Sequence, residues 1–203
     1  MAKSKVFKNC LALLLITLVA GFALAVVNEI TAKPISEAEN KAKMAAYESV
    51  FSGVEFEELN SSDKLIKAEN DSAPVQNASV DDVLRAVDKN GNTVGYVMSA
   101  TSASGYGGDV KIAIGISAAD DKITGFKVLS HSETAGLGAK CTEDDFQNQF
   151  AGKSAGKLSY VKNAAASDSE IDAISGATIT SSAVTDAVNA ATHFYSTLKE
   201  GQQ

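Results

Sequence analysis

The fold class is decided by Lys111-Ile112-Ala113-Ile114-Gly115-Ile116-Ser117. Isoleucine alternates there with small or polar residues, and a period of two places the three isoleucines on one face of a β-strand. We expect this strand over Val110–Ser117 and a second one over Lys122–Ser130, after the polar turn at 118–121. A connection this short joins antiparallel neighbours.

The preceding segment repeats this arrangement. β-prone runs at Val83–Asp88 and Thr93–Ala100 flank Lys89-Asn90-Gly91-Asn92. Asn-Gly between two such runs is the strongest short-range signal for a hairpin. The four runs together predict about four antiparallel strands in a meander.

Around this meander the pattern is weaker. Phe146 and Phe150 are four residues apart and predict a short amphipathic helix over Asp144–Phe150. Leu158–Val161 is a candidate for a further strand. Residues 60–80 are polar and predict a loop with a short strand near Lys64–Ala68.

The C-terminal segment is a strongly patterned helix. Its apolar residues fall on one stripe at helical spacing: Ala183, Val184, Ala187, Val188, Ala191, Phe194, Tyr195 and Leu198. Thr180 or Ser181 is the expected N-cap, and Gly201 follows the end. The predicted class is α+β, an antiparallel sheet packed against helices.

The N-terminus carries an apolar stretch preceded by lysines. Cys10–Val27 contains no charged residue, and a helix of that length spans roughly 27 Å, enough for a bilayer core. Lys3, Lys5 and Lys8 favour a cytoplasmic N-terminus and an extracytoplasmic remainder. Ala23-Leu24-Ala25 also fits a signal-peptide cleavage site, so a cleaved leader is the alternative.

The predicted domain boundaries follow from these segments. Residues 1–9 are the cytoplasmic N-terminus, 10–28 the transmembrane helix, 29–80 a helical and loop connection, and 81–200 the folded domain. Helical spacing of small apolar residues and a capping box, Ser36 with Glu39, predict a helix over 35–51. This helix can continue directly from the membrane span.

Composition argues against several function classes. A net charge of -7 and a pI near 4.9 disfavour binding to nucleic-acid phosphates. Cys10 lies in the apolar stretch, and the remaining Cys141 and two histidines 62 positions apart offer no metal-ligand spacing. No Ser-His-Asp arrangement is recognisable, which argues against a hydrolase.

The candidate site is Ser175-Gly176-Ala177-Thr178-Ile179-Thr180-Ser181-Ser182, at the start of the C-terminal helix. Unpaired N–H groups and the positive end of the helix dipole favour an anion there. Gly176 and Ala177 let a bulky ligand approach the backbone. From these residues alone, an ordinary helix start without a ligand remains the alternative.

Asp172-x-x-Ser175-Gly176-Ala177-Thr178 resembles the flavinylation signature of the FMN-binding domain family. The resemblance implies covalent FMN, joined as a phosphodiester to Thr178 by a flavin transferase that uses FAD. It also implies that the flanking residues Ser175, Gly176, Ala177, Ile179 and Thr180 belong to the cofactor site. Thr180 is the competing acceptor hydroxyl.

Two further segments support the resemblance. The first, at 131–138, resembles the family's Glu-Thr-Pro-Gly-Leu-Gly loop, with Ala135 where proline is usual; it adds Glu133, Thr134, Gly136, Leu137 and Gly138 to the implied site. The second, at 104–108, resembles a Gly-Tyr-x-Gly loop and adds Tyr106. These loops are expected near the ribityl chain or the flavin ring.

Three charged side chains in these segments have open roles. Glu133 is a candidate to hydrogen-bond the flavin or the ribityl hydroxyls, or a solvated turn residue. Lys140 either offsets the phosphate charge or lies on the surface. Asp172 belongs to the motif recognised by the transferase, or caps a turn.

The whole layout, a single N-terminal span followed by a domain with a C-terminal flavinylation motif, is similar to the G subunits of Rnf-type ion-translocating complexes. That similarity implies an electron-relay subunit between ferredoxin and NAD in the cell membrane, with other membrane and peripheral subunits as partners. The related C subunit of the sodium-pumping NADH:quinone reductase and a membrane-anchored FMN-binding sensor are the alternatives.

Overall fold

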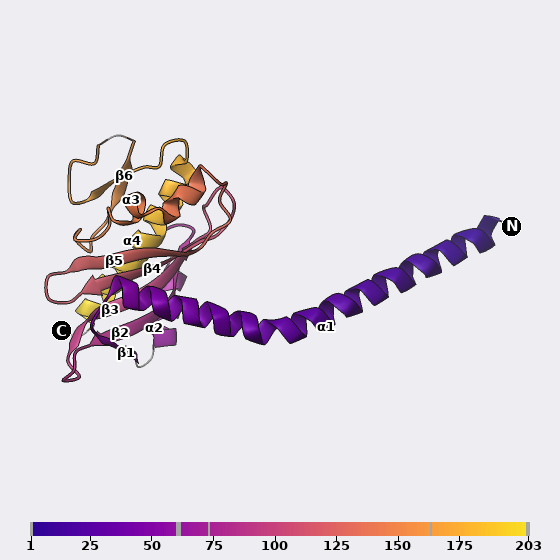
Figure 1. The fold of residues 1–203 in the computed structure, drawn as a ribbon, viewed down its shortest axis with the longest axis horizontal. Helices are drawn as coiled ribbons and strands as arrows, with labels where there is room; N and C mark the ends of the chain where they lie inside the picture. The colour runs from indigo at the N-terminus through magenta and orange to yellow at the C-terminus, as the bar shows by residue number, and fades with distance from the viewer. Residues whose placement is uncertain (1, 60–61, 73, 163, 202–203) are drawn as a thin grey trace. The chain divides into compact units, whose positions relative to one another are not determined.

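The computed structural model describes residues 2–59, 62–72, 74–162 and 164–201. The chain forms two compact units, which meet between residues 42 and 43. The first unit contains α1 (Ala2–Val50) up to Ala42, and the second contains the end of α1 and the remaining elements (Figure 1).

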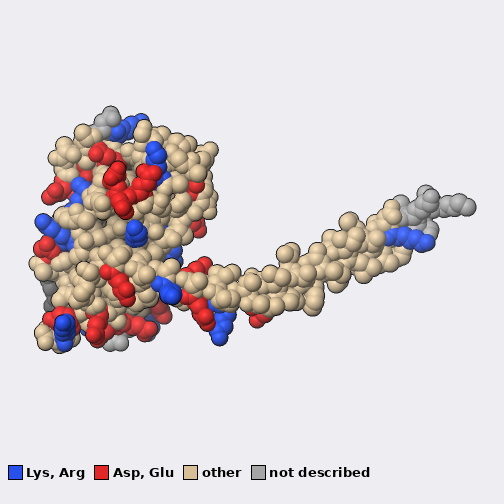
Figure 2. Space-filling model, in the orientation of Figure 1, with Lys and Arg blue, Asp and Glu red and all other residues tan. Residues whose placement is uncertain are grey.

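Helix α1 runs without interruption over Ala2–Val50 and includes Pro34. Within the described residues it is the one helix long and apolar enough to cross a membrane, over Phe7–Val50. Its apolar stretch carries neither blue nor red side chains in Figure 2. The helix expected over 35–51 is therefore confirmed as the continuation of the membrane-span candidate.

The second unit is built on a five-stranded sheet in the order β1-β2-β3-β4-β5, and every neighbouring pair is antiparallel. The strands are β1 (Glu55–Glu58), β2 (Ala78–Val87), β3 (Thr93–Ser102), β4 (Val110–Ser117) and β5 (Lys122–Ser130). The four predicted strands are confirmed, and β1 is an addition. Ile112, Ile114 and Ile116 share one fully buried face, as the alternation predicts.

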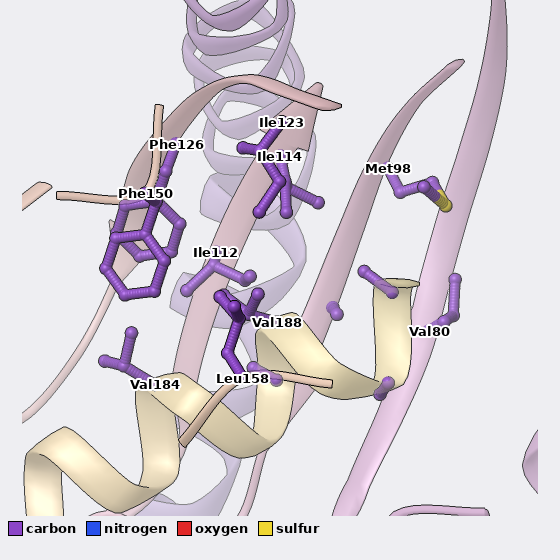
Figure 3. Close-up of a cluster of buried hydrophobic side chains, with 14 of the residues drawn as sticks. Val80, Met98, Ile112, Ile114, Ile123, Phe126, Phe150, Leu158, Val184 and Val188 are labelled. Atoms are coloured by element: carbon purple, nitrogen blue, oxygen red, sulfur yellow. The ribbon is translucent and has the colours of Figure 1, made fainter. Parts of the chain in front are cut away.

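Helix α4 (Thr178–Glu200) covers that face of the sheet. In Figure 3, Val184 and Val188 of α4 point toward Ile112 and its neighbours on the strands. The predicted apolar stripe of α4 is buried along its whole length. Fully burying side chains of this kind contributes about 1.5–3 kcal/mol each. This contact therefore stabilises the packing of α4 against the sheet.

The end of α1 covers the opposite face. Ala46, Tyr47 and Val50 pack with Val97 of β3 and Ala113 of β4. A Cβ at either Gly115 or Gly125 would lie under 3 Å from the backbone of Val50. Glycine at these strand positions lets α1 approach the sheet closely, so the sheet is buried on both faces.

The smaller elements complete the second unit. The 3-10 helix η1 (Gly138–Thr142) and helix α3 (Asp144–Gln147) follow β5, and β6 (Ser159–Val161) pairs in parallel with β7 (Glu170–Asp172). Phe146 and Phe150 are buried as expected, with ring centroids 5.6 Å apart. The strand expected over 158–161 is confirmed as β6.

The prediction for residues 60–80 was wrong. Helix α2 (Ser62–Ser72) occupies the segment where a short strand was expected; residues 60, 61 and 73 lie outside the described part. Its position depends on polar contacts to distant elements. The Asn70 side chain exchanges two hydrogen bonds with the backbone of Val80, and Glu69 pairs with His193 of α4. Apolar periodicity contains no signal for such contacts.

Candidate functional site

The entry to α4 is a tight turn held by its own first helical turn. The N–H of Ala177 donates to Ile174 O at 3.0 Å, and Gly176 has a φ of 78°. This φ at the third position is the type II turn geometry that favours glycine. The Ser181 hydroxyl accepts the N–H of Ile174 at 2.9 Å and donates to Ala177 O. The turn is therefore fixed to the helix that follows it.

Helix α4 starts at Thr178 and not at the expected cap residues. Ala177 is the N-cap, and in the described part of the chain no side chain caps this end. Thr180 and Ser181 lie inside the first helical turn. The tight turn at 174–177 starts the helix at Thr178, before the first residue of the predicted apolar stripe. The first N–H groups of an α-helix have no partner within the helix, and the positive end of the helix dipole favours an anion beside them.

The loop at 131–138 forms a second turn of the same kind. Leu137 N–H donates to Thr134 O at 3.2 Å, and Gly136 has a φ of 77°. The η1 helix starts directly after this turn. The hydroxyl of Thr180, in the other motif segment, donates to Glu133 Oε2 at 2.6 Å, and a Cβ added at Gly176 would lie 3.4 Å from Leu137 Cδ2. The two motif segments therefore touch.

The loop at 104–108 closes the site from a third side. A Cβ on Gly107 would overlap the backbone of Ser132, so only glycine permits this approach. Gly107 N–H donates to Glu133 Oε1 at 3.1 Å. Tyr106 lies between Gly105 and Gly107 in the sequence, and 71% of its surface is exposed.

These three segments line one cavity of about 510 Å³. That volume lies within the range of small-molecule sites, about 300–1,000 Å³. Ten of the twelve residues implied by the family resemblance line it: Tyr106, Glu133, Thr134, Leu137, Gly138, Gly176, Ala177, Thr178, Ile179 and Thr180. Ser175 and Gly136 do not line the cavity; both lie at exposed turn positions.

The two candidate threonines differ in their environment. Thr178 is partly exposed and lies at the uncapped end of α4. Thr180 is 1% exposed, and its hydroxyl donates to Glu133 Oε2 at 2.6 Å. The Thr180 oxygen is thus engaged in a buried hydrogen bond, while Thr178 is accessible from the cavity.

The rim of the cavity is apolar. Tyr106, Leu137 and Ile179 are 71%, 47% and 51% exposed, and all three line the cavity. Exposed apolar side chains gathered around one concavity are typical of a ligand site. A planar ring system fits against this rim, and a phosphate group fits at the start of α4. The residues present are therefore suited to FMN.

The remaining charged candidates do not line the cavity, except for Glu133. The carboxylate of Asp172 accepts the N–H of Ala165 at 2.7 Å, so it holds the loop before β7. Lys140 is exposed and lies in η1, outside the lining of the cavity. Glu133 is 9% exposed, so the solvated-turn interpretation of this residue was wrong.

A second cavity, of about 540 Å³, lies along the later part of α4. Asp186, Asn189 and His193 are among its lining residues, together with Lys157. Burial raises the pKa of Asp186. The lining residues include none of the motif residues, so the candidate site is the cavity at the start of α4.

Comparison with known proteins identifies related chains. The FMN-binding domain family matches residues 105–193. The G subunit of the Na(+)-translocating ferredoxin:NAD(+) oxidoreductase complex of Acetobacterium woodii is 37% identical over 200 residues, which cover 96% of this chain and 94% of the relative. The G subunit of the ion-translocating oxidoreductase complex of Methanosarcina acetivorans is 41% identical over 133 residues, 62% of this chain and 68% of the relative.

Two solved structures are similar to part of the chain. NqrC of Shewanella oneidensis has a TM-score of 0.49 at 23% identity, covering 58% of this chain and 60% of that one. The C subunit of the Na(+)-translocating NADH-quinone reductase of Parabacteroides distasonis has a TM-score of 0.46 at 27% identity, covering 56% and 61%.

Proposed function

Because the chain belongs to the family of G subunits of ion-translocating oxidoreductase complexes, we propose that it relays electrons in a membrane-bound ferredoxin:NAD(+) oxidoreductase through FMN carried covalently on Thr178. The cofactor follows from the FMN-binding domain at 105–193. The observation that supports the choice between the two motif threonines is that Thr178 is partly exposed and lines the cavity, while the hydroxyl of Thr180 is bonded to Glu133.

Attachment of the flavin is a substitution at phosphorus that needs a separate transferase and FAD. The Thr178 hydroxyl oxygen forms a bond to the FMN phosphorus of FAD. The bond between that phosphorus and the bridging pyrophosphate oxygen breaks, AMP leaves with the bridging oxygen, and the hydroxyl proton passes to solvent. Thr178 lies at the surface end of α4, where a separate enzyme has access to it.

After attachment, the N–H groups of the first turn of α4 stabilise the remaining negative charge of the phosphodiester. These groups have no side-chain cap in the described part of the chain, and anionic groups at a helix N-terminus gain typically about 0.3–1 kcal/mol. The phosphate thus supplies the partner that the helix start lacks.

FMN when bound supplies one- and two-electron transfer. The chain's own residues orient it. Tyr106, Leu137 and Ile179 offer apolar contact to the ring, and their exposure leaves part of the site open to solvent and to a partner. An electron carrier needs one edge of its cofactor within reach of the next centre, and this open rim is suited to that.

The proposed location is the cell membrane, with the second unit on the extracytoplasmic side. The single candidate span in α1 and the lysines before it support this orientation. A covalent bond prevents loss of the cofactor by dilution on that side. The other subunits of the complex, and the flavin transferase during maturation, are the proposed partners.

Peptide mass spectrometry of the full chain, co-expressed with a flavin transferase, tests the proposal. We expect an FMN-sized mass increase on the peptide that contains Thr178, with fragment ions that place it on that residue. Flavin fluorescence should persist in a denaturing gel. An unmodified Thr178 under these conditions, or an adduct on Thr180, contradicts the proposed attachment.

A further inference from the structure

Glu133 holds a buried carboxylate between two walls of the cavity. Its Oε1 accepts the N–H of Gly107 at 3.1 Å, and its Oε2 accepts the hydroxyl of Thr180 at 2.6 Å. Both contacts are donated to the carboxylate, which is what its ionised form requires. One side chain thus joins the 104–108 loop to Thr180 in the first turn of α4, which lies 47 residues after Glu133.

The space around this carboxylate is closed by glycines. A Cβ on Gly105 would lie 2.7 Å from Glu133 Oε1, and a Cβ on Gly138 would lie 2.5 Å from the Thr180 hydroxyl oxygen. Neither position tolerates a side chain without a shift of the carboxylate or of α4. Glycine at these two positions therefore leaves the space that the carboxylate and the Thr180 hydroxyl occupy.

The charge of Glu133 has no cationic partner among the described residues, because none of the ion pairs found there includes it. Its backbone N–H donates to His131 Nδ1 at 3.1 Å. The charge acts on its surroundings: burial first, and Glu133 second, raise the pKa of Cys141.

We propose that Glu133 is a positioning residue of the flavin cavity, which fixes the 104–108 loop and the start of α4 and lowers the reduction potential of the flavin held between them. The inference rests on the proposed FMN site. A fixed negative charge makes the addition of an electron to a nearby flavin less favourable, and the effect is larger in a cavity of reduced dielectric. The effect is larger again where no cation compensates the charge. Glu133 acts through position and charge, since both of its oxygens are engaged by the protein.

Glu133→Gln and Glu133→Ala test this in the full chain. Glutamine has the same shape without the charge. We expect flavinylated Glu133→Gln to show a midpoint potential shifted to more positive values in spectroelectrochemical titration. Glu143→Gln removes the same charge at an exposed position and is the matched control, which should leave the potential unchanged. An unchanged potential in Glu133→Gln overturns the electrostatic part of the inference.

Hydrogen exchange on the chain expressed without transferase tests the positioning part independently of flavin. In Glu133→Ala we expect faster exchange in both 104–108 and 178–182, with partial rescue in Glu133→Gln. Faster exchange in one segment alone overturns the coupling. If Glu133→Ala does not fold, the comparison of Glu133→Gln with the parent chain decides. A parent chain that acquires no flavin contradicts the proposed function, and the exchange result still decides the positioning role.

Discussion

The Thr180 hydroxyl lies 2.6 Å from Glu133 Oε2, and this contact separates the roles of two threonines that lie within one helical turn. Thr180 is engaged in a buried hydrogen bond that holds the start of α4. Thr178 is partly exposed and lines the cavity, and its hydroxyl is the proposed acceptor. The same short segment therefore contains one structural and one proposed reactive hydroxyl.

Thr178→Val should abolish covalent flavin while the chain still folds, since valine has nearly the shape of threonine and no hydroxyl. Thr178→Ser keeps the hydroxyl and should retain flavin. In-gel fluorescence and intact-mass measurement check both variants. Covalent flavin on Thr178→Val at the parental level would assign the attachment to another residue.

Thr180→Val should keep the covalent flavin and lose stability. The substitution leaves a buried oxygen of Glu133 without its donor, which costs about 1–3 kcal/mol. Urea unfolding of the variant and the parent chain measures the difference. A stability equal to the parent's would mean that the contact with Glu133 contributes nothing net. Loss of the flavin adduct, with the fold intact, would reverse the assignment of the two threonines.

Ala135→Pro should stabilise the chain by about 0.4–1 kcal/mol, because Ala135 is the second residue of a type II-like turn whose third residue is Gly136. Ala139→Pro is the matched control. The N–H of Ala139 donates to Thr134 O at 3.1 Å, so proline removes a hydrogen bond there and should destabilise. Thermal unfolding of both variants checks the two signs, and destabilisation by Ala135→Pro contradicts the turn assignment.

Cys141 should resist alkylation in the folded chain at pH 8. Burial, followed by the charge of Glu133, raises the pKa of this thiol to about 11, above the ordinary value of 9.0. The unfolded thiol ionises first as pH rises, so this contribution to stability is complete below pH 9 and is lost as pH approaches 11. A Cys10→Ser background leaves Cys141 as the single thiol, and iodoacetamide labelling with and without denaturant measures the protection. Rapid labelling of the folded chain contradicts it.

The elements that repeat a local period were predictable, and those held by polar contacts were not. The strand over 110–117 and the stripe of α4 follow from apolar spacing, and both are confirmed. Helix α2 was assigned to a loop because its position depends on Asn70 and Glu69, whose partners are distant in the chain. The α4 cap was misplaced because the turn at Gly176, and not a side chain, starts the helix.

The class of fold, the membrane-span candidate and the segments that resemble a flavin site all follow from the amino-acid sequence. The first two depend on the composition and spacing of neighbouring residues, and the third on motifs that resemble those of a known family. Which of the two motif threonines has its hydroxyl in a buried hydrogen bond is visible only in the tertiary structure. Residues 178 and 180 are about 200° apart around a helix axis, so their side chains point in different directions, and that of Thr180 meets Glu133. That choice depends on a contact across 47 residues, which no local pattern encodes.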